Sequence, residues 1–270
     1  MPGPARVSGT VTSADGTLVA YDRYGSGPAV VLVNGAFGDR AHPTLAGVAA
    51  ALSPWFTVLN YDRRGRGGSG DTRPYAVERE VEDLAAVIGA AGGTAMVFGG
   101  SSGAALALEA AARGLPIGRL AVWEPPYHVD DSAPPLPDDF AVQLEELVDA
   151  GKWEEAVERF MVEAAQVPAP AVAAMRADPS WAAVEGVART LAYEAAVLGP
   201  GNRLPAALAS IAMPTLVLSG ELSPRWMANA ALAVAAAVPG ARHRVLEEQT
   251  HAVSPEALVP ELLEFFARVA

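Results

Sequence analysis

The sequence predicts an α/β protein with a doubly wound, mostly parallel sheet of eight strands and a block of helices inserted between the sixth and seventh strands. Three observations support this. Short apolar runs typical of buried strands alternate with longer stretches of helical periodicity, which indicates parallel βαβ units. Between residues 140 and 198 only helical patterns occur. At residues 94–115 a strand, a turn of small residues and an alanine-rich helix follow one another directly.

The first six strands are expected before residue 125. The alternating runs at 7–11 and 17–24 flank Asp15-Gly16, which favours an antiparallel hairpin at the sheet edge. The later runs are mostly unbroken and apolar, as in strands covered on both faces. They lie at 29–33, at 56–62, at the start of 94–115 and at 118–123. Helical periodicity predicts helices at 44–52 and 77–91 between them.

The second half changes character at Pro125-Pro126 and an acidic, proline-rich linker at 130–139. Helices are then predicted at 140–150, 153–165, 171–177 and 181–198. A strand at 214–218, a helix at 226–238, a strand at 242–247 and a helix at 255–269 complete the chain. These patterns predict three segments, with the first part of the core at 1–125, a helical insertion at 126–208 and the second part of the core at 209–270.

Composition excludes several classes of function. The chain has 270 residues, of which 51% are hydrophobic, so it can bury one large core. It has no cysteine, which excludes disulfides, thiolate metal sites and a cysteine nucleophile. A net charge of −12 argues against nucleic acid or an anionic membrane as a partner. Residues 1–16 show no apolar core after a basic segment, and no membrane-spanning apolar run occurs, so we expect a cytoplasmic protein.

The turn after the fifth strand reads Gly99-Gly100-Ser101-Ser102-Gly103 and satisfies the G-x-S-x-G pattern. A turn that lifts a serine hydroxyl above the edge of a sheet has strained dihedral angles and tight contacts, so glycines must flank it. The N–H of Ser102 then opens the next helix, where unpaired amides can stabilise an oxyanion. Taken alone, the pattern also fits a serine that only caps a helix.

With these pieces in place, the chain resembles the α/β-hydrolase superfamily over nearly its whole length, and within it serine esterases with a helical lid. The resemblance rests on the serine turn, on residues 34–37 (NGAF), on residues 61–70 (YDRRGRGGSG) and on Gln249-Thr250-His251 before the last helix. In this family the nucleophile precedes the acid and the histidine comes last. The resemblance implies an α/β-hydrolase fold in which the helical insertion acts as a lid.

The candidate catalytic residues begin with Ser101 as nucleophile and His251 as general base, because histidine can take and return a proton near neutral pH. His42, His128 and His243 belong to no such constellation. We therefore expect them to be structural or solvated.

The acid of the triad has two candidates. The family usually places an aspartate three residues after the glycine that ends the seventh strand, but Ser223 stands there. Glu124, at the end of the strand at 118–123, and Glu221 can replace it. Some members of the superfamily carry the acid after the earlier strand, so Glu124 is favoured and Glu221 is the alternative. Without a catalytic role, Glu124 ties the linker to the core and Glu221 is a solvated loop residue.

The resemblance also implies an oxyanion hole formed by the N–H groups of Ala36 and Ser102. Asn34 stands where the family usually has histidine and can brace the loop with its polar side chain. Gly100 replaces a bulkier residue and widens the site.

Apolar side chains of the predicted lid can line a substrate pocket, although most residues at this helical spacing belong to a core. We expect Phe37, Gly100, Trp153 and Trp181 to contact the substrate.

Three arginines follow the fourth strand. Arg63, Arg64 and Arg66 have the composition of a clamp for phosphate or carboxylate, but the equivalent loop of the family is mainly scaffolding tied by Asp62. We therefore favour a structural role.

These features predict a serine hydrolase that cleaves an ester of an apolar small molecule, or a lactone or thioester, without a metal or an organic cofactor. One alternative is a non-hydrolytic enzyme of natural-product chemistry, such as acyl transfer, carbon–carbon cleavage or cyclisation. Another is a catalytically silent ligand-binding protein, which the displaced acid, Asn34 and Gly100 favour.

Overall fold

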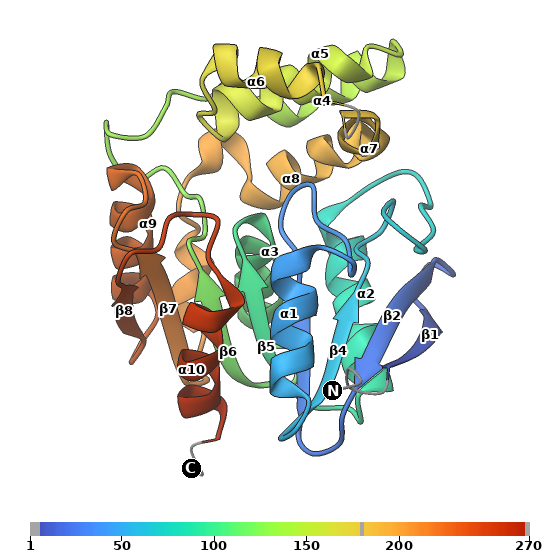
Figure 1. Ribbon diagram of the computed structural model, residues 1–270, viewed down its shortest axis with the longest axis vertical. Helices are drawn as coiled ribbons and strands as arrows, with labels where there is room; N and C mark the ends of the chain where they lie inside the picture. Colours follow the sequence, from blue (N-terminus) through green and yellow to red (C-terminus); the bar gives the residue numbers. More distant parts are fainter. Residues whose placement is uncertain (1–5, 179–180, 268–270) are drawn as a thin grey trace.

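An eight-stranded sheet forms the centre of the protein, in the order β1-β2-β4-β3-β5-β6-β7-β8 (Figure 1). The computed structural model describes residues 6–178 and 181–267. β1 and β2 pair antiparallel, β2 and β4 also pair antiparallel, and the remaining pairs are parallel. This confirms the predicted fold class. The strands are β1 Arg6–Thr12, β2 Leu18–Tyr24, β3 Ala29–Val33, β4 Thr57–Tyr61, β5 Ala95–Gly100, β6 Ile117–Trp123, β7 Thr215–Gly220 and β8 Arg242–Leu246.

Helices cover both faces of the sheet, because successive side chains of the buried strands point to opposite sides. In β3, Val31 and Val33 belong to a core shared with α2 (Val77–Ala90), α3 (Ser102–Ala112) and α9 (Arg225–Ala237). Val30 and Leu32 pack in a second core with α1 (Pro43–Leu52) and α10 (Pro255–Phe266). The unbroken apolar run of β3 therefore reflects burial on both faces.

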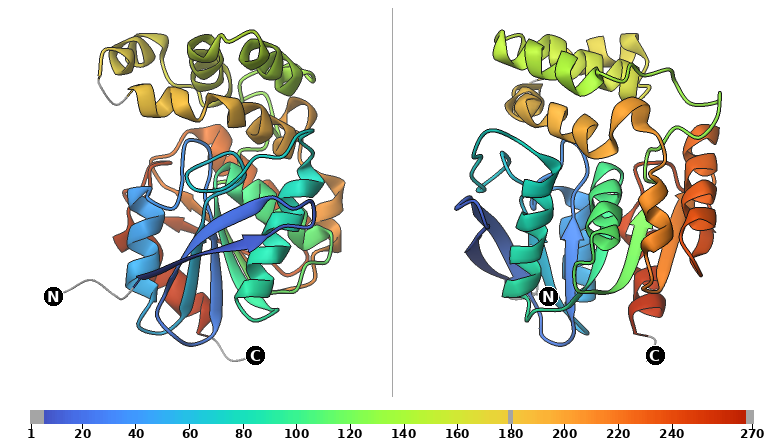
Figure 2. Two further views of the ribbon diagram at one scale, coloured as in Figure 1. Left: turned by 90° about the vertical axis from the view of Figure 1, so that its right-hand side faces the viewer. Right: turned by 180° about the vertical axis from the view of Figure 1, so that it is seen from behind.

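The segment between β6 and β7 forms the helical insertion, and its helices at residues 140–198 lie over the carboxyl ends of the parallel strands, in yellow-green to orange (Figures 1 and 2). It connects β6 to β7 and contains a third core of its own. Its helices are α4 Phe140–Asp149, α5 Trp153–Arg159, α6 Ala169–Arg176, α7 Trp181–Gly186 and α8 Leu191–Leu198. A π-helical turn, Phe160–Ala164, continues α5, and 3₁₀ turns occur at Ala188–Thr190, Pro200–Asn202 and Ala206–Ser210.

One predicted helix of the insertion is broken. The periodic stretch 181–198 forms α7 and α8, separated by the 3₁₀ turn Ala188–Thr190. The Thr190 hydroxyl donates to the Val187 carbonyl at 2.8 Å and accepts from Arg66 Nε at 3.1 Å. The break therefore brings a polar side chain to a buried arginine, a contact that periodicity does not encode.

The ends of the chain are described only in part. The last helix, predicted to reach residue 269, ends at Phe266, and residues 268–270 lie outside the described residues. Residues 1–5 lie outside them as well, so the expectation drawn from residues 1–16 falls partly outside the described residues. In the part of the chain that is described, no helix has the length and apolar character required to cross a membrane.

Candidate active site

Ser101 lies at the sharp turn between β5 and α3, with φ 56° and ψ −125°. The turn is pressed against neighbouring backbone. A Cβ on Gly103 would lie 2.4 Å from the Val33 carbonyl oxygen, and one on Gly99 would lie 2.4 Å from that of Gly103. Only glycine fits at either position, and the strained Ser101 backbone is held in place by its surroundings.

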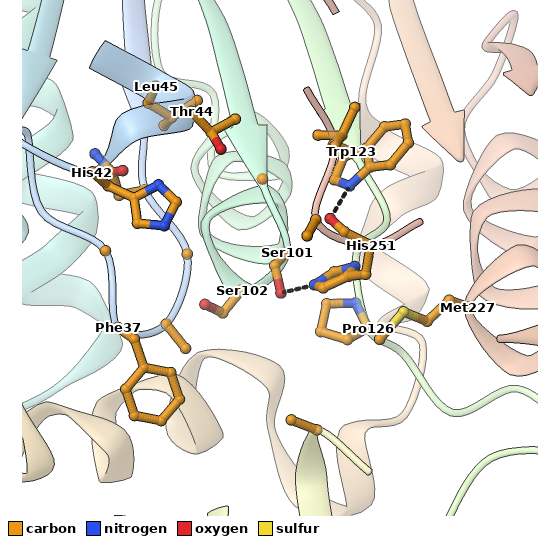
Figure 3. A pocket seen from close by; sticks show the side chains of 18 of the residues that line it. Phe37, His42, Thr44, Leu45, Ser101, Ser102, Trp123, Pro126, Met227 and His251 are labelled. Atoms are coloured by element: carbon orange, nitrogen blue, oxygen red, sulfur yellow. Dashed lines mark hydrogen bonds between the residues drawn. The ribbon is translucent and has the colours of Figure 1, made fainter. Parts of the chain in front are cut away.

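Three side chains from distant segments, those of Ser101, His251 and Glu124, meet above this turn. His251 Nε2 lies 3.1 Å from Ser101 Oγ, and His251 Nδ1 lies 2.7 Å from Glu124 Oε2. In Figure 3 the dashed line between Ser101 and His251 marks the first of these contacts. Both distances allow hydrogen bonds, so the three side chains form one connected chain of polar contacts, which is the geometry that a nucleophile, a base and an acid require.

Glu124 is completely buried directly after β6. Its Oε1 accepts a hydrogen bond from the Gly220 N–H at 2.8 Å, while its Oε2 faces His251. Two donors therefore hold the carboxylate in one orientation, as a buried acceptor requires. The φ of Glu124 is 41°, an uncommon value for a residue other than glycine.

The other acid candidate lies elsewhere. Glu221 is exposed, and its Oε2 accepts from the Glu248 N–H at 3.1 Å. Of the two glutamates, the structure brings Glu124 to His251.

The predicted oxyanion-hole residues border the same space. Ser102 is the first residue of α3, where N–H groups have no acceptor within the helix. Ala36 belongs to the β3 loop, residues 34–38, and both residues line the cavity beside Ser101. Asn34 Nδ2 donates to Asn60 Oδ1 at 3.0 Å, so its buried side chain ties this loop to β4.

A cavity of about 330 Å³ opens onto Ser101. Figure 3 shows His42, Thr44 and Leu45 on one side of the serine, and Trp123 and Met227 on the other. Most of the cavity wall is apolar, and no Asp, Glu, Lys or Arg of the described residues takes part in it. This wall suits a small molecule that is uncharged and largely apolar.

The expected substrate contacts are reproduced in part. Phe37 and Gly100 line the cavity, whereas Trp153 and Trp181 do not, so the expectation for the two tryptophans is corrected. Trp153 is 45% exposed, with its Nε1 donating to the Val148 carbonyl, and Trp181 packs inside the core of the insertion. Periodicity identified them as apolar helix residues, but it does not tell which face of a helix turns toward the sheet.

Other segments supply the wall in their place. Phe160 and Leu198 reach the cavity from the insertion, and Trp226 and Met227 reach it from the first turn of α9. Sequence reasoning missed Leu198, Trp226 and Met227 as pocket residues. For the latter two a signal existed, because they closely follow β7, whose carboxyl end lies at the same edge as that of β5.

The remaining histidines lie outside the triad. His42 is exposed at the cavity wall. His128 is half-buried edge-on to Trp226, and burial lowers its pKa. His243 contacts Ser219 Oγ at 2.9 Å, and burial lowers its pKa as well.

The arginines after β4 are buried, and none lines the cavity. Arg64 donates two hydrogen bonds to Asp83, both at 2.8 Å. Asp62 accepts from the N–H groups of Arg40 and Gly68, which ties the loop as expected of scaffolding. Among the described residues, no group of three His, Asp or Glu side chains could hold a metal ion.

Comparison with known proteins agrees with the fold. The model of a family described as "Alpha/beta hydrolase family" matches residues 30–257. A crystal structure of an alpha/beta hydrolase from Sphaerobacter thermophilus DSM 20745 is 55% identical, with a TM-score of 0.89, and the match covers 96% of this chain and 100% of that one. A hydrolase structure from Pseudomonas aeruginosa PA01 shares the fold at 23% identity and a TM-score of 0.72, over 97% and 98% of the two chains.

A curated relative matches a shorter stretch. The uncharacterized hydrolase YraK of Bacillus subtilis (strain 168) is 37% identical over 98 residues. The match spans 35% of this chain and 35% of the relative's own length.

Proposed function

Because this chain belongs to the alpha/beta hydrolase family, we propose that it is a serine hydrolase that cleaves carboxylic esters of uncharged, apolar small molecules. The observation that carries the proposal is the chain of contacts from Ser101 through His251 to Glu124, at the floor of an apolar cavity. Lactones and thioesters present the same acyl carbon and are related candidate substrates.

In the proposed mechanism Ser101 Oγ attacks the carbonyl carbon while His251 Nε2 takes its proton. The oxyanion accepts hydrogen bonds from the N–H groups of Ala36 and Ser102. His251 then gives the proton to the leaving alcohol, and the Glu124 carboxylate stabilises the imidazolium. Water hydrolyses the acyl-enzyme by the same steps, with His251 again acting as base.

The cavity supports the choice of substrate. No Asp, Glu, Lys or Arg among the described residues lines the cavity, so a charged group of the substrate would lack a permanently charged partner there, and burying it unpaired is costly. The net charge of −12 also disfavours the approach of anions. Phe160 and Leu198 of the helical insertion form part of the wall, and we infer that the insertion serves as a lid over the bound ester.

The test is intact mass spectrometry after incubation with a fluorophosphonate, together with hydrolysis of p-nitrophenyl esters from acetate to octanoate. We expect one adduct on the wild type and none on Ser101→Ala, with ester hydrolysis lost in the same variant. A folded wild type that gains no adduct contradicts the proposal and favours a silent ligand-binding protein. Product analysis with a competing alcohol separates hydrolysis from acyl transfer.

A further inference from the structure

Two buried arginines, Arg63 and Arg66, donate hydrogen bonds to backbone carbonyl groups of the β3 loop, residues 34–38. Arg66 Nη1 donates to the Gly35 carbonyl at 2.6 Å and to the Gly38 carbonyl at 3.1 Å. Arg63 Nη1 donates to the Asn34 carbonyl at 3.3 Å. The loop is thus held by its carbonyl groups on both sides of Ala36.

The contact with Gly35 has a direct consequence for the candidate oxyanion hole. The Gly35 carbonyl and the Ala36 N–H belong to the same peptide unit, which is planar and trans, so the two groups point in opposite directions. An arginine that fixes the direction of the Gly35 carbonyl therefore also fixes the direction of the Ala36 N–H. Rotation of this one peptide would remove a donor from the oxyanion hole.

Arg66 is itself held by the helical insertion. Glu194 of α8 is completely buried, and its Oε1 contacts Arg66 Nη2. Its Oε2 accepts from Arg63 Nη1 at 2.7 Å. Thr190, at the break before α8, accepts from Arg66 Nε at 3.1 Å. Two side chains of the insertion thus orient the guanidinium that holds the Gly35 carbonyl.

Charge balance makes Glu194 necessary to this arrangement. Arg63 already shares Glu80, which accepts from its Nε at 2.6 Å and from its Nη2 at 2.7 Å. Glu194 then supplies the second carboxylate for two guanidinium groups in a site closed to water. Removing one member of such a buried set leaves a charge uncompensated, so the remaining groups rearrange.

We propose that Glu194 is a positioning residue: acting through Arg66, it sets the orientation of the Gly35–Ala36 peptide and so couples the seating of the helical insertion to the oxyanion hole. Glu194 does not border the cavity and touches no reacting atom. The inference rests on the proposed function, because it assigns the Ala36 N–H to the oxyanion. It makes the insertion a part of the catalytic geometry as well as a cover.

Glu194→Gln tests the coupling, and Asp83→Asn is the matched control. Asp83 is equally buried and accepts two hydrogen bonds from Arg64. The other contacts of Arg64 go to Asp15 and to the Arg79 carbonyl, away from the β3 loop. Both variants remove one buried carboxylate, from Arg63 and Arg66 in Glu194→Gln and from Arg64 in Asp83→Asn. Only Glu194→Gln is expected to affect the peptide at Ala36.

The assay measures kcat and KM for p-nitrophenyl butyrate and the inhibition constant of a trifluoromethyl ketone, whose adduct oxygen occupies the oxyanion hole. For Glu194→Gln we expect kcat to fall about 10- to 100-fold with KM changed less than about threefold. The reason is that the misplaced donor, the Ala36 N–H, stabilises the oxyanion of the transition state more than it stabilises the bound substrate. The ketone should bind more weakly by the same factor as kcat/KM. Asp83→Asn should lower the melting temperature and keep kcat within about threefold.

Thr190→Val gives a second test that leaves every buried charge in place. It removes the acceptor of Arg66 Nε, and we expect kcat to fall about three- to tenfold without a change in KM. The inference is overturned if either folded variant keeps wild-type kcat and ketone affinity, or if Asp83→Asn loses as much kcat as Glu194→Gln. A wild type that neither hydrolyses esters nor reacts with a fluorophosphonate contradicts the proposed function instead.

Discussion

Replacing Glu124 by glutamine tests the choice of acid. Both carboxylate oxygens accept hydrogen bonds, Oε1 from the Gly220 N–H and Oε2 from His251 Nδ1. Glutamine offers one oxygen and one NH₂ group. Its NH₂ group must therefore face one of the two present donors, either the Gly220 N–H or His251 Nδ1. If that partner is Gly220, two N–H groups oppose each other in a closed site, at a cost of about 1–3 kcal/mol.

The second orientation is the more favourable one, because the peptide N–H of Gly220 cannot change its role whereas an imidazole can change its tautomer. The NH₂ group then donates to His251 Nδ1 and moves the imidazole proton to Nε2. In that tautomer Nε2 cannot accept the proton of Ser101. In serine proteases the corresponding change from acid to amide lowers kcat about 10⁴-fold. At 1.36 kcal/mol for each tenfold, this raises the barrier by about 5.5 kcal/mol.

The assay compares kcat for p-nitrophenyl butyrate and the rate of fluorophosphonate labelling in the wild type, Glu124→Gln and Glu221→Gln. We expect Glu124→Gln to lose about three to four powers of ten in both rates. Glu221 is exposed and accepts a hydrogen bond from the Glu248 N–H, so Glu221→Gln should keep both rates within about twofold of the wild type. Circular dichroism checks that each variant is folded. The assignment is refuted if Glu124→Gln keeps more than about a tenth of wild-type kcat, or if Glu221→Gln is the slower variant.

Three further outcomes are expected. A Cβ on Gly100 meets no atom within 4 Å, so the side chain of Gly100→Leu enters the cavity; kcat/KM should fall at least about tenfold for an octanoate ester and little for an acetate ester. The wild type should prefer p-nitrophenyl butyrate to the p-nitrophenyl monoester of succinate by about 100-fold or more, because no Lys or Arg of the described residues lines the cavity to pair with the free carboxylate; equal rates would contradict the substrate class. Burial lowers the pKa of His128 and His243, so the unfolded chain binds protons that the native state does not. The free energy of unfolding should therefore fall as the pH drops below about 6.5, and less steeply in His243→Gln, as followed by urea unfolding.

The sequence by itself predicted the features whose causes are local. The turn at Ser101 spans five successive residues, so Gly99 and Gly103 indicate it in the sequence, although the backbone that requires glycine at 103 belongs to Val33 of β3. A strand that is buried on both faces is continuously apolar, and such runs differ from helical periodicity. The order of strands and helices could therefore be predicted from the pattern of apolar residues. The role of His251 was predicted because the chain carries motifs of a family in which the histidine comes after the nucleophile and the acid.

Only the tertiary structure decided which distant side chains meet. Glu124 and Glu221 both follow strands that end at the same edge of the sheet, and the folded chain brings Glu124 to His251. Trp153 and Trp181 have the apolar character of pocket residues, yet the packing of the insertion turns them away from the cavity. Glu194 stands in an ordinary helical pattern, and nothing near it in sequence indicates Arg66. Periodicity records whether a side chain is buried, whereas its partners depend on how separate elements are placed in space.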